Sequence, residues 1–228
     1  MSDNTQADHR TRVAANRREK TRNRLIQSAI PVFASKGVDA SAIEDVIAAA
    51  GVSRGTFYNY FQSNRELLLA VNEQLSDELI LIVAETVAEI PDPAERVAAS
   101  VALLIQFARD NPLLARFVAK VGLEAAGPGG LICDYLISQI QEGIDQGRFL
   151  ECPLNIALDL LAGATLFAFL RISLGGIGDT HGPDVVTTIL RGLGLDAQEA
   201  ARLAAKPLLK MDVHTSCSLM RKVCVADE

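Results

Sequence analysis

Residues 43–61 concentrate side chains whose types and spacing suit contact with a phosphate backbone. The chain has three tyrosines and eight phenylalanines, and four of these eleven rings lie within residues 57–61. Gly51 stands where a turn between two short helices needs a positive φ, and Ser53 stands where its hydroxyl can cap the second helix. The exposed positions of that helix carry groups able to hydrogen-bond a phosphate or a base edge: Arg54, Thr56, Tyr58 and Asn59. The pattern predicts a helix-turn-helix motif, and the alternative is an ordinary helical hairpin with a surface tyrosine.

A basic segment lies directly upstream of this motif. It contains Arg10, Arg12, Arg17, Arg18, Lys20, Arg22 and Arg24. The whole chain carries a net charge of −6, which by itself argues against a nucleic-acid partner. However, residues 1–65 hold 10 basic and 6 acidic residues (+4), and residues 66–228 hold 12 basic and 22 acidic ones (−10). Phosphate contact by the basic segment is therefore favoured over a merely solvated charge run.

Nearly the whole chain has the apolar periodicity of helices, and no segment shows strand-like alternation. The sequence therefore predicts an all-α fold. A polar, mobile arm is expected over residues 1–17 and a first helix from Arg18 to Lys36, kinked at Pro31. Further helices are expected at residues 42–50, 54–60, 64–90, 93–110, 112–126, 131–146, 153–174, 183–193 and 197–206. A loosely held tail is expected over residues 207–228.

Residues 25–71, with IEDVIAAAGVSRGTFYNYF at their centre, resemble the DNA-binding domain of the TetR (tetracycline repressor) family of bacterial regulators. The resemblance implies a homodimer in which residues 18–65 form a three-helix DNA-binding domain that offers its third helix to the major groove. Residues 66–206 would then form a larger helical domain that binds a small effector and dimerises through its last two long helices. Two-fold symmetry would imply a palindromic operator of double-stranded DNA.

The resemblance also suggests which residues contact DNA. They are Ser41, Arg54, Gly55, Thr56, Tyr58, Asn59, Tyr60, Asn64 and Arg65, and the basic segment adds Arg18 and Lys20. Three residues depart from the family pattern. Asn64 replaces a frequent lysine, which weakens one phosphate contact unless Arg65 substitutes, Ile47 occupies a usually small position, and Pro31 interrupts a helix normally free of proline.

The acidic half of the chain is less informative. Residues 154–174 are apolar on most of the helix circumference, which suits either half of a four-helix dimer interface or an intramolecular core. The candidate effector-binding residues are Phe107, Phe117, Val121, Cys133, Tyr135, Leu136, Phe167 and Arg171, although a plain core role suits most of them singly and a structural or surface role suits Arg171. An apolar pocket with few fixed charges would suit a lipophilic effector.

Several other classes are not supported by the sequence. No catalytic motif, paired carboxylates or zinc-ligand spacing occurs, so neither an enzyme nor a metal or cofactor site is expected. No signal peptide or membrane-spanning segment is expected either, so the cytoplasm is the predicted location. The sequence thus predicts a transcriptional repressor released from DNA by an effector. The alternative is an effector-independent DNA-binding regulator or architectural protein.

Overall fold

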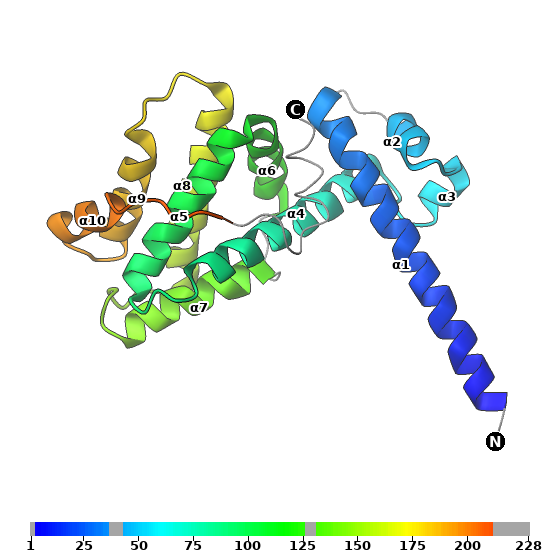
Figure 1. Cartoon of the computed structure of the whole chain (residues 1–228), viewed down its shortest axis with the longest axis horizontal. Helices are drawn as coiled ribbons and strands as arrows, with labels where there is room; N and C mark the ends of the chain where they lie inside the picture. Colours follow the sequence, from blue (N-terminus) through cyan, green and yellow to red (C-terminus); the bar gives the residue numbers. More distant parts are fainter. Residues whose placement is uncertain (1–2, 37–42, 126–130, 212–228) are drawn as a thin grey trace. The chain divides into compact units, whose positions relative to one another are not determined.

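The structure, a computed structural model, describes residues 3–36, 43–125 and 131–211 of the chain (Figure 1). Every regular element in these residues is an α-helix, which confirms the all-α fold class. In chain order they are α1 (Asp3–Lys36), α2 (Ile43–Ala50), α3 (Arg54–Tyr58), α4 (Asn64–Val87), α5 (Pro93–Asp110), α6 (Pro112–Ala125), α7 (Leu131–Asp145), α8 (Leu154–Leu174), α9 (His181–Gly192) and α10 (Ala197–Ala204). Helices α2 to α10 agree with the expected ones to within three residues at either end.

The chain divides into two compact units, Met1–Val71 and Asn72–Glu228. The first contains α1, α2, α3 and the first two turns of α4, and the second contains the rest of α4 and α5 to α10. The boundary between the units therefore falls inside a single continuous helix.

The start of the first helix differs from the expectation. A mobile arm was predicted up to residue 17, but α1 begins at Asp3 and runs without a break through Pro31, and its first half extends beyond α2 and α3 (Figure 1). Arginine, alanine, glutamate and lysine favour helix even where no apolar stripe is present. Apolar periodicity marks only the part of a helix that packs, so it could not show where a solvated helix begins.

The core of the first unit forms around the C-terminal half of α1. Ile26, Ala29, Ile30 and Phe33 are buried, as their spacing predicts, and Leu25 joins them. Val46, Ala50 and Phe57 of the helix-turn-helix are buried too. The spacing around Gly51 also predicts Val52 and Tyr60 in this small core, but both are only half-buried, whereas Phe61 is buried.

The second unit is built around α5 and α8. Helix α8 packs against α5, α6, α7 and α9, while α9 packs against α5 and α10. The side of α8 that meets these neighbours carries residues at three- and four-residue spacing, which places them on one face of the helix. They are Ala157, Leu161, Thr165, Ala168, Phe169 and Ile172.

A charged network ties the last helix to the first turn of α5. Asp92 caps α5 by accepting a hydrogen bond from the amide of Ala94 at 3.0 Å. Arg148, between α7 and α8, donates to both carboxylate oxygens of Asp92 at 2.8 Å and to Glu199 of α10 at 3.0 Å. The hydrogen bond from Arg148 lowers the pKa of Asp92, and Arg202 together with Arg148 lowers the pKa of Glu199 to about 2.

Replacing Arg148 with alanine is expected to lower the melting temperature at pH 7 by about 2–6 °C, since a charge-assisted hydrogen bond contributes roughly 1–2 kcal/mol. Both carboxylates have lowered pKa values, so their contribution is complete above the unfolded values near 4 and is lost as the pH falls toward 2. The difference between wild type and variant should therefore shrink between pH 4.5 and pH 2. Thermal unfolding followed by circular dichroism measures it. Equal melting temperatures at pH 7 would contradict the structural role of Arg148.

Candidate nucleic-acid interface

The turn before α3 is formed by residues suited to their positions. Gly51 has φ +62°, the left-handed conformation that the motif requires of it. The hydroxyl of Ser53 accepts a hydrogen bond from the amide of Thr56 at 3.1 Å, so Ser53 is the N-cap, as predicted. The hydroxyls of these two residues also share a hydrogen bond of 2.9 Å. Together these contacts fix where α3 begins.

The start of α4 is capped with one difference from the expected pattern. The amide of Glu66 donates to the Ser63 hydroxyl at 3.2 Å, as a capping box requires. The carboxylate of Glu66 accepts from the amide of Gln62 at 2.6 Å, one residue before the Ser63 amide that the capping-box spacing of Ser63 and Glu66 predicts as its donor. The cap therefore reaches back into the segment that follows α3.

Short as it is, α3 presents three different sides. Phe57 is fully buried and anchors the helix. Arg54, Gly55 and Tyr58, at i, i+1 and i+4, are exposed on one side, and the Tyr58 ring packs edge-on against Phe57 at 5.4 Å. Thr56 and Asn59, at i and i+3, lie on another side.

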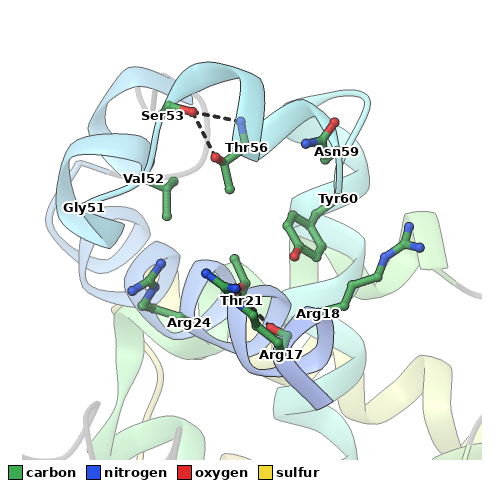
Figure 2. Close-up of a pocket in the computed structure, with 10 residues that line it drawn as sticks. All are labelled: Arg17, Arg18, Thr21, Arg24, Gly51, Val52, Ser53, Thr56, Asn59 and Tyr60. Atoms are coloured by element: carbon green, nitrogen blue, oxygen red, sulfur yellow. Dashed lines mark hydrogen bonds between the residues drawn. The ribbon is translucent and has the colours of Figure 1, made fainter. Parts of the chain in front are cut away.

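The side of α3 that carries Thr56 and Asn59 forms one wall of an open groove of about 800 Å³, and α1 forms the opposite wall. Figure 2 shows Arg17, Thr21 and Arg24 of α1 facing the turn and α3 across this space. The complete lining is Arg17, Arg18, Thr21, Arg24, Gly51, Val52, Ser53, Thr56, Asn59 and Tyr60. The lining holds three arginines, three hydroxyl side chains, a phenol and an amide, and no carboxylate. Such a groove is suited to an anion.

Two cation–π contacts hold α1 beside the aromatic cluster. The guanidinium of Arg18 lies 6.0 Å from the centre of the Tyr60 ring, and that of Arg22 lies 5.5 Å from the centre of the Phe61 ring. These contacts explain part of the concentration of rings in residues 57–61, because Phe57 packs in the core and Tyr60 and Phe61 each support an arginine of α1.

The structure brings together only part of the predicted DNA-contact set. Thr56, Asn59, Tyr60 and Arg18 line the groove, whereas Arg54, Gly55 and Tyr58 lie outside its lining. Lys20 and Arg65 are exposed away from the groove lining, and Asn64 is half-buried at the start of α4. Ser41 lies outside the described residues.

Sequence reasoning did not select Arg17, Thr21 and Arg24 individually, nor Glu44 of α2, whose carboxylate is paired with Arg54. A signal for the first three was present, because Arg17 and Arg24 are seven residues apart with Thr21 between them, one face of a continuous helix. It could not be used while the helix was expected to begin at Arg18.

The candidate effector-binding residues fall into two groups, one inside the second unit and one exposed on α8. Phe107, Phe117, Val121 and Leu136 are buried, and Cys133 and Tyr135 are half-buried. Burial raises the pKa values of the Cys133 thiol and the Tyr135 phenol, so both stay protonated at neutral pH. Phe167 and Arg171 are exposed on α8 and do not point into the interior of the second unit.

Two family models match the chain. The model described as bacterial regulatory proteins, tetR family, matches residues 25–71, and the model described as Tetracyclin repressor-like, C-terminal domain, matches residues 92–206. The second match alone covers half of the chain and the two matches do not overlap.

Curated relatives agree with these matches. An uncharacterized HTH-type transcriptional regulator of Mycobacterium tuberculosis, Rv1255c, is 29% identical over 124 residues, which is 53% of this chain. The match spans 61% of the length of that relative. The HTH-type transcriptional activator FasR of Mycolicibacterium smegmatis is 31% identical over 90 residues, which is 40% of this chain and 41% of FasR.

Solved structures show the same fold. RolR in complex with resorcinol superposes with a TM-score of 0.72 at 27% identity, covering 87% of this chain and all of RolR. A TetR-family transcriptional regulator from Pectobacterium atrosepticum superposes with a TM-score of 0.62 at 24% identity, covering 78% of this chain and 96% of that regulator. Both units of the chain are therefore accounted for by one kind of protein, and the chain belongs to the TetR family of helix-turn-helix transcriptional regulators.

Proposed function

We propose that this regulator is a cytoplasmic homodimer that represses transcription from a palindromic operator and is released from it by a small, apolar effector. Residues 18–65 bind DNA, and residues 66–206 bind the effector and dimerise. The observation that carries the proposal is the carboxylate-free groove between α1 and α3, next to an exposed side of α3 that offers Arg54 and Tyr58. A surface of this kind suits a polyanion whose base edges are also within reach.

The two polar sides of α3 suit two different kinds of contact. Arg54, Gly55 and Tyr58 form the side that enters the major groove, where an arginine reads guanine and an unsubstituted glycine lets the backbone approach closely. Thr56, Asn59 and Tyr60 face the arginines of α1. In the proposed complex a strand of the sugar–phosphate backbone lies between these two walls. Base contacts then specify the sequence, while the groove supplies affinity and register.

Replacing both Arg17 and Arg24 with alanine tests the groove. The double variant is expected to bind every duplex sequence more weakly and to flatten the plot of log K against log salt by roughly 0.9 for each phosphate that it no longer neutralises. Its preference for the operator over unrelated DNA should change little. Titration of labelled duplexes at several salt concentrations measures both quantities. Arg116→Ala, which removes one exposed arginine of α6, is the control for loss of a positive charge outside the groove and should leave the slope unchanged.

The outward face of α8 supports dimerisation. Ile156, Phe167 and Leu174 are 56%, 54% and 69% exposed, an unusual exposure for large apolar side chains. Ile156, Gly163 and Leu170 follow one another at seven-residue spacing, and so do Leu160, Phe167 and Leu174. Together these six residues form a continuous apolar stripe along the helix. Among the described helices α8 is also long and apolar enough to cross a membrane, a test that core helices of soluble proteins pass too. A second copy of the chain is the occupant that the family suggests for this stripe.

The interior of the second unit suggests the chemistry of the effector. The buried candidates are aromatic and aliphatic, and Tyr135 adds a neutral hydroxyl that can exchange a hydrogen bond with a polar group. RolR, the similar structure, is described in complex with resorcinol, a small aromatic molecule with hydroxyl groups. An effector of this class, mostly apolar with one or two hydroxyls, would match the chemistry of these side chains.

The proposed function is tested with the purified full-length protein and the DNA upstream of its own gene. A footprint with two-fold symmetry, together with a lower DNA affinity in the presence of resorcinol or another small phenol that binds the protein, is the expected result. Reporter expression that rises when the gene is deleted would support repression. A protein that binds such a ligand without any change in DNA affinity would contradict the effector-controlled mechanism and favour the effector-independent alternative.

A further inference from the structure

An ion pair joins α2 to α3 on the side of the helix-turn-helix outside the groove lining. Nη2 of Arg54, the first residue of α3, lies 3.0 Å from Oε1 of Glu44 in the first turn of α2. Both side chains are exposed, Arg54 to 66% and Glu44 to 61%. An exposed ion pair of this kind adds little to folding stability, so stability does not explain why Glu44 and Arg54 are paired here.

A carboxylate is an unfavourable neighbour for DNA phosphates. Glu44 repels the backbone, so it weakens any bound state in which Arg54 simply rests on a phosphate. In the major groove, however, a carboxylate has one good partner, because the N4 amino group of cytosine donates a hydrogen bond to it. Glu44 therefore disfavours nonspecific contact of Arg54 with a phosphate and leaves base recognition as the favoured role of Arg54.

The geometry of the guanidinium allows base recognition with the ion pair intact. Arginine has five N–H donors, and Nη2 is the atom that lies 3.0 Å from Glu44. The remaining donors can reach O6 and N7 of guanine, the commonest specific contact of an arginine. Guanine is paired with cytosine, so the basic and acidic ends of the ion pair match the acceptors and the donor of one G·C pair.

We propose that Glu44 is a specificity-determining residue, which holds Arg54 for recognition of a G·C pair and discourages its binding to phosphates. The inference rests on the proposed binding of duplex DNA by α3. In this role Glu44 lowers the affinity for arbitrary sequences and raises the discrimination at one position of each half-site.

The variant Glu44→Gln tests this role, since it removes the charge and keeps the size. The wild-type dimer is first used to select its preferred sites from a pool of random 30-base-pair duplexes, and both proteins are then titrated with those sites and with calf-thymus DNA. For Glu44→Gln we expect the discrimination at one G·C pair in each half-site to fall about tenfold, since Arg54 is no longer held by a carboxylate in the position from which it contacts guanine. On calf-thymus DNA the slope of log K against log salt should steepen by roughly 0.9 for each Arg54 that now binds a phosphate.

Two further variants make the result specific. Glu89→Gln changes the net charge equally at an exposed position near the end of α4 and should leave discrimination unchanged. In the double variant Glu44→Gln/Arg54→Ala, the effect of Glu44→Gln on discrimination should vanish, because Glu44 acts through Arg54.

The outcomes distinguish this proposal from the proposed function. A wild-type protein that selects no sequence from the pool would overturn both. A wild type that selects a palindrome, with a Glu44→Gln variant of the same discrimination and the same salt slope, would overturn only the role of Glu44. An effect of Glu44→Gln that persists without Arg54 would overturn it as well.

Discussion

Replacing Tyr58 with alanine is expected to abolish operator-specific binding while leaving the dimer and the helix content unchanged. Tyr58 is 45% exposed, so its ring is available to a partner, and the adjacent Phe57 carries the packing of α3. A good contact with a base edge discriminates by roughly 1–3 kcal/mol, and a dimer makes it twice. The affinity for the selected operator should therefore fall by about 30-fold or more, whereas binding to calf-thymus DNA should change little. Fluorescence anisotropy with both duplexes measures the two affinities.

The conservative variant Tyr58→Phe separates the two contributions of the side chain. It keeps the edge-on contact with Phe57 at 5.4 Å and removes only the hydroxyl. An intermediate loss would assign part of the specificity to a hydrogen bond from the phenol. Equal losses of dimer, melting temperature and DNA affinity in Tyr58→Ala would show instead that the ring is part of the core.

The helix-turn-helix could be predicted from sequence because its determinants are local. Gly51 supplies the conformation of the turn, Ser53 caps α3 within three residues, and Phe57 fills the core from the helix that follows. Each of these effects acts over a few residues, so the spacing alone defines it. Which side chains of α3 face the groove and which are exposed elsewhere could not be predicted in this way, since it depends on the position of α1, a helix distant in sequence.

The groove itself could not be predicted from composition. The basic segment was recognised, but its role depends on α1 being helical before residue 18, which places Arg17, Thr21 and Arg24 on one face opposite Thr56. A solvated helix of arginines and alanines carries no apolar period, and its polar composition suited a mobile arm equally well. The pairing of Glu44 with Arg54 was missed for a similar reason, because it joins two helices across a turn.

The face of α8 that packs against its neighbours could not be predicted, because the helix is apolar on almost every side. Its sequence is apolar almost all round, which suits a dimer interface and an intramolecular core alike, so it could not show which way the effector-binding candidate Phe167 faces. In the structure Leu161, Ala168 and Ile172 face the neighbouring helices, whereas Ile156 and Phe167 face outward. Which apolar face is internal depends on packing partners far away in sequence. Because α8 has no polar face, its periodicity cannot distinguish the buried face from the exposed one.

Replacing Phe167 with aspartate is expected to convert the dimer into a monomer and to remove operator binding. Phe167 lies near the middle of the outward stripe of α8, where a carboxylate in a dimer interface would be withdrawn from water among apolar side chains. The interior of each chain should be unaffected, because the side chain is already half exposed. A monomer reaches one half-site at a time, so the affinity for the palindrome should fall by roughly 100-fold to 10 000-fold.

Sedimentation equilibrium and operator titration on the same samples connect the two effects of this variant. Leu81→Asp is the matched control, since Leu81 is a comparably exposed leucine, 49% exposed, on α4 outside the stripe. It should remain dimeric and bind the operator as the wild type does. If Phe167→Asp stayed dimeric with unchanged affinity, the stripe would not be the interface. If it became monomeric yet bound the palindrome normally, two linked half-sites would not be the basis of recognition, and the symmetric model of operator binding would have to be abandoned.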